Sequence, residues 1–161
     1  MTSEFAANVL VVAAWVVLIV HLCVLSFIDY REHRLPNRWV ASAGICGITM
    51  LTAAAYLGHD FEMLGRGVLA GFATSAVLLM ANAFGGLGMG DVKLAAVLGL
   101  YLGWFSWTAT FAGVWLAFAL AAITVLVRAV RNHREWRKAV AFGPYLSAGT
   151  MAVGAFIAIG F

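Results

Sequence analysis

Two long apolar runs of this chain are separated by the stretch Gly85-Gly86-Leu87-Gly88-Met89-Gly90-Asp91-Val92-Lys93. Its four glycines interrupt the helical pattern, because glycine in a helix interior costs about 1 kcal/mol relative to alanine. Asp91 follows them at the edge of an apolar run. A carboxylate is costly at such a position, so it indicates a functional site. A second carboxylate, Asp29, occupies the matching position at the end of the first apolar run.

The composition is that of a membrane protein. Of 161 residues, 64% are hydrophobic and 11% are charged, whereas soluble domains carry about 25% charged residues. The apolar runs lack the alternation of a transmembrane barrel, so we expect an all-α integral membrane protein forming a single polytopic domain over residues 1–161. We expect about six transmembrane helices, of which the fourth is short for a bilayer. Their predicted spans are roughly 5–28, 38–57, 66–84, 92–106, 108–128 and 140–160.

The basic residues predict the orientation of these spans. Nine of the ten lie in the first, third and fifth connections, which the positive-inside rule places in the cytoplasm, and the tenth is Arg66. Both termini should therefore lie outside, and both aspartates should emerge on the cytoplasmic side of the cell membrane. The basic run 128–138 predicts contact with the anionic inner leaflet. The net charge of +3 comes from these loops and gives no indication of a nucleic-acid partner.

Two aspartates at one membrane face can form a catalytic pair. Neighbouring carboxylates share one proton, so that the ionised member removes a proton from water while the protonated member polarises a peptide carbonyl. The pattern thus predicts an intramembrane aspartic protease with Asp29 and Asp91 as its dyad. Which aspartate is the acid and which the base is left open.

Neither a metal nor a cofactor is expected. Cys23 and Cys46 do not form a CxxC pair, which argues against a zinc site. The glycine segment is not read as a phosphate-binding loop, because such a loop follows a strand in a soluble α/β unit.

Three segments resemble the type IV prepilin leader peptidase family, a group of GxGD-type membrane proteases. They are Asp29 followed by Leu35-Pro36-Asn37, Gly88-Met89-Gly90-Asp91 with Lys93, and Phe142-Gly143-Pro144-Tyr145-Leu146. The resemblance implies that Asp29 and Asp91 are catalytic. It implies that prepilin and pseudopilin precursors are the substrates, and that their short basic leaders are cut at the cytoplasmic membrane face. The residues expected to bind substrate or shape the site are Pro36, Asn37, Gly88, Gly90, Lys93, Gly143 and Pro144.

One departure from the family pattern concerns methylation. Larger, bifunctional members carry a cytoplasmic insert with paired CxxC motifs and also methylate the new N-terminus. The chain resembles instead the short, peptidase-only branch, such as members that serve Tad/Flp-type pili or archaeal flagella, and N-methylation is not expected. Two other readings stay open: a small proton-coupled transporter and a non-catalytic assembly factor. The substrate's identity and the oligomeric state are also left open.

Overall fold

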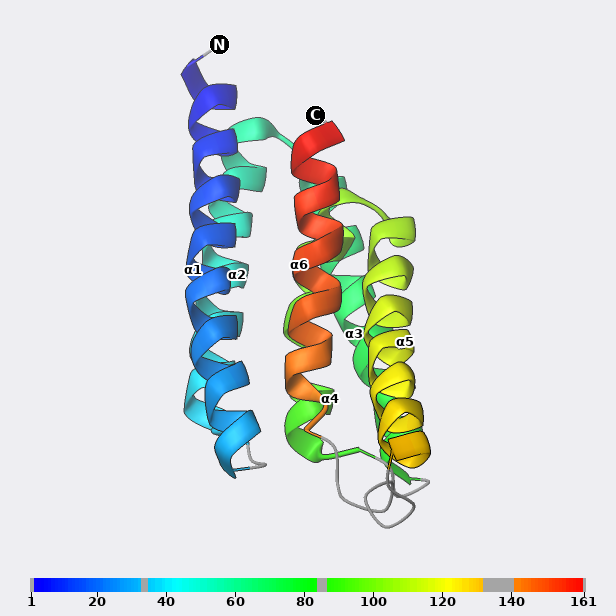
Figure 1. Cartoon of the computed structure of the whole chain (residues 1–161). Helices are drawn as coiled ribbons and strands as arrows, with labels where there is room; N and C mark the ends of the chain where they lie inside the picture. Colours follow the sequence, from blue (N-terminus) through cyan, green and yellow to red (C-terminus); the bar gives the residue numbers. More distant parts are fainter. Residues whose placement is uncertain (1, 33–34, 84–86, 132–140, 161) are drawn as a thin grey trace.

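The computed structural model describes residues 2–32, 35–83, 87–131 and 141–160. Within these ranges the chain forms helices and no strand, as expected for an all-α protein. Consecutive helices run antiparallel, so both ends of the chain lie at one end of the bundle (Figure 1). The helices are α1 (Thr2–Glu32), α2 (Asn37–Gly58), α3 (Phe61–Ala83), α4 (Met89–Phe105), α5 (Trp107–Arg131) and α6 (Gly143–Gly160).

Five of these helices, all except α4, are long and apolar enough to cross a membrane. The chain is therefore a multi-pass membrane protein. Most helices extend beyond the predicted apolar spans: α1 reaches Glu32 rather than residue 28, and α3 begins at Phe61 rather than residue 66. Backbone hydrogen bonding continues past an apolar run wherever polar side chains can still face water, so composition alone underestimates helix length.

The short helix α4 lies at the centre of the bundle. It packs against α2, α3, α5 and α6, and 12 of its 17 residues are buried. Tyr101, at 0% exposure, is the largest of the fully buried side chains in the described residues. Because neighbouring helices rather than lipid surround α4, its length need not match the thickness of the hydrocarbon layer.

Small residues let α3 and α4 approach closely. A Cβ at Gly67 would lie 2.7 Å from the carbonyl oxygen of Leu100, and a Cβ at Gly71 equally close to that of Ala96. Thr74 Oγ1 donates a hydrogen bond to the Ala95 carbonyl at 2.9 Å. Such contacts replace the hydrophobic driving force that is missing between helices in lipid.

Arg66, the one basic residue outside the three basic connections, caps the far end of α4. Its Nε donates to the Gly103 carbonyl at 2.9 Å, and its Nη2 donates to the carbonyls of Trp104 and Phe105 at 2.6 and 2.9 Å. The last carbonyls of a helix lack intrahelical donors and carry partial negative charge. The position of Arg66 is therefore explained by a structural role, the capping of α4.

Candidate active site

Asp29 joins the end of α1 to the beginning of α6. It is buried, with 5% of its surface exposed, and its Oδ2 accepts a hydrogen bond of 3.0 Å from the N–H of Gly143. Gly143 is the first residue of α6, where backbone N–H groups have no partner inside the helix and the helix dipole favours an anion. The carboxylate is thus held in one orientation by a residue 114 positions away.

Asp91 lies in the first turn of α4 and is also buried, at 7% exposure. Its Oδ2 accepts a hydrogen bond of 3.2 Å from the N–H of Gly88, the residue that caps the helix in an extended conformation. Asn82, near the end of α3, donates to the Leu87 carbonyl and so anchors the approach to this cap. Oδ1 of Asp91 is buried and has no hydrogen-bond partner in the part of the chain that the structure describes. Oδ2 of Asp91 is therefore fixed, while Oδ1 is buried without a described donor.

Leu35 fills the space between the two helix starts. A Cβ at Gly90 would lie 2.8 Å from the Cβ of Leu35, and a Cβ at Gly143 would lie 3.4 Å from its Cδ2 and 2.7 Å from Oδ2 of Asp29. Both glycines are thus required by close approach. Leu35 acts as a spacer that sets how closely the start of α4 approaches Asp29.

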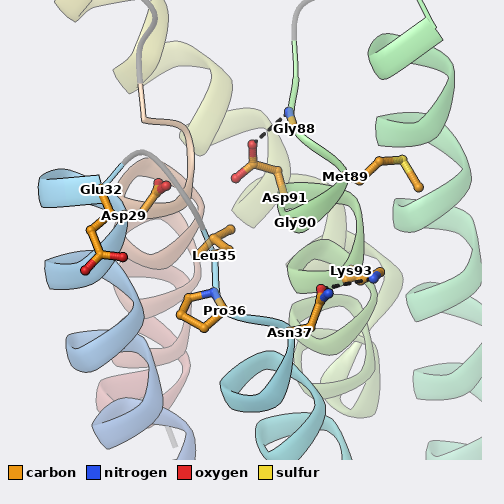
Figure 2. A pocket seen from close by; sticks show the side chains of 10 residues that line it. All are labelled: Asp29, Glu32, Leu35, Pro36, Asn37, Gly88, Met89, Gly90, Asp91 and Lys93. Carbon is orange, nitrogen blue, oxygen red and sulfur yellow. Dashed lines mark hydrogen bonds between the residues drawn. The ribbon is translucent and has the colours of Figure 1, made fainter.

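A cavity of about 590 Å³ opens beside these groups (Figure 2). Asp29 enters its wall from α1 and Asp91 from α4, while Lys93 Nζ donates a 3.0 Å hydrogen bond to Asn37 Oδ1 between α4 and α2. The lining therefore combines three separate segments of sequence. It consists of Asp29, Glu32, Leu35, Pro36, Asn37, Gly88, Met89, Gly90, Asp91 and Lys93.

Comparison with known proteins now identifies the family. The model of the type IV leader peptidase family matches residues 16–130, a range that includes both aspartates. The chain belongs to this family. It is 29% identical over 145 residues to a prepilin leader peptidase/N-methyltransferase of Pectobacterium carotovorum subsp. carotovorum, covering 85% of this chain and 50% of that protein. A relative of the same name from Aeromonas salmonicida (strain A449) is 29% identical over 135 residues, or 82% of this chain and 45% of the relative.

This leader peptidase family member spans about half the length of the curated relatives it matches. No solved structure matches the chain. The spatial arrangement of the site therefore comes from the contacts described above.

Most of the predicted site residues of this family member meet at the cavity. Asp29, Asp91, Gly88, Gly90, Lys93, Pro36 and Asn37 line it. Gly143 reaches it through its hydrogen bond to Asp29, whereas Pro144 is half-buried in α6 and lies outside the lining. Sequence reasoning did not select Glu32, Leu35 or Met89 for the site. For Glu32 a signal existed, because a residue three positions after Asp29 shares its helix face.

The environment of Asp91 favours the neutral acid. This residue precedes the run 92–106 that was expected to enter the bilayer. Burial raises the pKa of Asp91 from 3.8 to about 6, the Gly88 hydrogen bond opposes that rise, and the negative charge of Asp29 adds to it. The two carboxylates are therefore electrostatically coupled.

Some sequence predictions fall on residues outside the described ranges. These include Arg34, Gly85, Gly86 and most of the basic run 128–138, of which Arg128 and Arg131 lie in the last turn of α5. In residues 2–32, 35–83, 87–131 and 141–160, no three His, Cys, Asp or Glu side chains gather where they could hold a metal ion.

Proposed function

We propose that this chain is an aspartic endopeptidase of the cytoplasmic membrane that removes the short basic leader from type IV prepilin-like precursors. The observation that carries the proposal is a pair of buried aspartates, from α1 and α4, on one cavity wall. Family membership supports a leader peptidase reaction, and the names of the relatives, prepilin leader peptidases, suggest the substrate class.

The dyad accounts for the chemistry. Asp29 accepts a hydrogen bond at the positive end of α6, an arrangement that favours its ionised form. Asp91, buried with one unpartnered oxygen, suits the protonated form. In this scheme Asp29 removes a proton from water as the hydroxyl adds to the peptide carbonyl, which Asp91 polarises. Asp91 transfers its proton to the carbonyl oxygen, which gives a gem-diol. As the gem-diol collapses and the C–N bond breaks, the leaving nitrogen takes the proton held by Asp29, and Asp91 regains the proton released by the gem-diol hydroxyl.

The charge distribution supports a cytoplasmic site. Arg31, Lys93 and Arg131 lie in the helix-end regions on the side of the bundle that holds the cavity, whereas the described chain ends lie at the opposite side (Figure 1). Under the positive-inside rule the dyad faces the cytoplasm and both termini face outward. A precursor whose apolar segment lies in the bilayer would then present its leader junction at the level of the two aspartates.

The proposal is confined to the peptidase reaction. The relatives' names include an N-methyltransferase activity, and the chain spans about half of their length. Its two cysteines, Cys23 and Cys46, are free and not arranged as CxxC. The cysteine pattern resembles that of the peptidase-only branch, so the proposal covers leader removal and not methylation.

The first prediction is loss of leader removal when either aspartate is neutralised. Each of Asp29→Asn and Asp91→Asn should reduce cleavage by at least about 100-fold, since general acid–base groups contribute about 10²–10⁴-fold each. The chain is co-expressed with a candidate prepilin, and cleavage is measured by gel shift and N-terminal sequencing. Asp60→Asn, which makes the same change in the exposed turn between α2 and α3, is the matched control.

Comparable amounts of each variant in the membrane fraction exclude misfolding as the cause. Cleavage that survives either substitution would make that aspartate a structural residue and contradict the dyad. The transporter and assembly-factor alternatives would then be the ones to test.

A further inference from the structure

One acidic side chain of the cavity has no role in the proposed reaction. Glu32 is the last residue of α1 and lines the same cavity as Asp29 and Asp91 (Figure 2). Residues three apart on a helix share a face and are separated by about 4.5 Å along the axis. Glu32 therefore lies beyond Asp29, on the side away from the apolar run 5–28.

The charges of the cavity favour a cation. Among the described residues of its wall, Asp29 and Glu32 carry carboxylates and Asp91 is the proposed neutral acid, whereas Lys93 supplies the single ammonium group. This ammonium group is already hydrogen-bonded to Asn37. No residue in the described ranges forms a hydrogen bond or ion pair with the Glu32 carboxylate.

The neighbouring cation on α1 is engaged elsewhere. The guanidinium of Arg31 lies 4.7 Å from the centroid of the Phe27 ring, a cation–π contact. Glu32 therefore presents an acceptor with no described partner, in the lining of a cavity whose volume of about 590 Å³ can hold a ligand side chain.

A second observation points to a ligand in this cavity. Oδ1 of Asp91 is buried and unpartnered among the described residues, and a buried acceptor without a donor is costly. A bound peptide with its attacking water would supply donors to Asp91 and a side chain to Glu32 at the same time.

We propose that Glu32 is a specificity residue whose carboxylate binds a lysine or arginine side chain of the substrate's leader. The inference rests on the proposed function, since it requires a peptide cut between Asp29 and Asp91. We expect the cationic residue to lie on the leader side of the cut bond, because Glu32 follows Asp29 in α1 and the substrate's apolar segment occupies the bilayer side.

The test uses the full-length protein in nanodiscs and synthetic peptides that share one apolar segment and one leader. The peptides differ only in having Lys, Gln or Glu at one of the two positions before the cut bond. In Glu32→Gln, kcat/KM for the Lys peptide should fall about fivefold, mainly through KM, while the value for the Gln peptide changes less than twofold.

Three further variants sharpen the comparison. Glu32→Asp should retain the preference for the Lys peptide, and Glu32→Lys should reverse it toward the Glu peptide. Glu62→Gln, which removes an exposed carboxylate at the other end of the bundle, should leave the ratio of the Lys to the Gln peptide unchanged.

Binding of the same peptides to Asp91→Asn separates this inference from the proposed function. Absence of cleavage by the wild type would overturn the peptidase assignment, whereas the ratio of Kd values for the Lys and Gln peptides still tests Glu32. A ratio that Glu32→Gln leaves unchanged would overturn the specificity role. An equal loss for both peptides, through kcat alone, would also overturn it by showing that Glu32 supports the dyad instead.

Discussion

At the scale of single residues, the two aspartates occupy different environments although both are acidic groups at helix ends. Asp29 accepts a hydrogen bond from the first N–H of α6, while Asp91 folds back on its own helix cap and keeps one buried oxygen without a described partner. Environments that differ in this way separate the roles of two chemically identical groups. The proposed assignment of base to Asp29 and acid to Asp91 rests on this asymmetry.

The asymmetry predicts a pH dependence. Because the pKa of Asp91 is raised to about 6, its carboxyl holds a proton below that pH and loses it above. The proposed reaction needs that proton, so kcat should fall as the pH rises above about 6, approaching a tenfold loss per pH unit.

Steady-state cleavage of one peptide between pH 5 and pH 8.5 measures this dependence, with protein integrity checked at each pH. A kcat that rises steadily across this range would contradict the assignment of the acid to Asp91.

At the scale of helices, the close packing of α3 against α4 determines the position of Asp91. Gly67, Gly71 and Thr74 bring α3 against α4 over about two helical turns, and Arg66 caps the C-terminal end of α4. Since Asp91 lies at the other end of α4, these contacts fix the position of the helix that carries this carboxylate. Substitutions that disturb these contacts should lower the stability of the protein more than they change the geometry of the site.

Arg66 provides the test at this scale. Arg66→Gln should lower the free energy of unfolding by about 1–3 kcal/mol, because up to three carbonyls of α4 lose a charged donor. Thermal unfolding in one detergent, followed by circular dichroism, measures the change. Arg131→Gln, an exposed position at the end of α5, is the matched control, and an equal effect of both substitutions would contradict the capping role.

The sequence predicted the helices better than it predicted their contacts. The apolar runs located the six helices of the described residues, and the two aspartates were recognisable because each carboxylate borders such a run. The predicted helix ends were wrong by a few residues, because helical backbone hydrogen bonding continues beyond the ends of the apolar runs. The bond from Gly143 to Asp29 and the spacing role of Leu35 could not be derived, because both depend on how segments far apart in the chain pack.

At the scale of the whole molecule, the candidate site is assembled from two parts of the chain. The hairpin of α1 and α2 supplies Asp29, while α4 and α6 supply Asp91 and Gly143. The turn that joins α2 to α3 lies at the opposite end of the bundle from the cavity (Figure 1) and contains His59 in a left-handed conformation.

This division predicts that the chain can be split. Fragments 1–59 and 60–161 should each be inactive, because each holds one of the two proposed catalytic aspartates, and co-expression should restore a measurable fraction of leader cleavage. Restoration should disappear when the first fragment carries Asp29→Asn. If both fragments accumulate in the membrane and cleavage is not restored, the covalent turn is required for assembly of the site.

The central position of α4 also makes the surrounding lipid act unequally on the two carboxylates. Bulky side chains along α1, such as Phe5, Val12 and Val20, are exposed on the bundle surface, whereas most of α4 is enclosed by other helices. A mismatch between the hydrocarbon thickness and the apolar length of the helices therefore acts directly on α1, which carries Asp29, while α4, which carries Asp91, is shielded by its neighbours. We therefore expect the thickness of the membrane to affect the separation of the two proposed catalytic carboxylates without any change in the sequence.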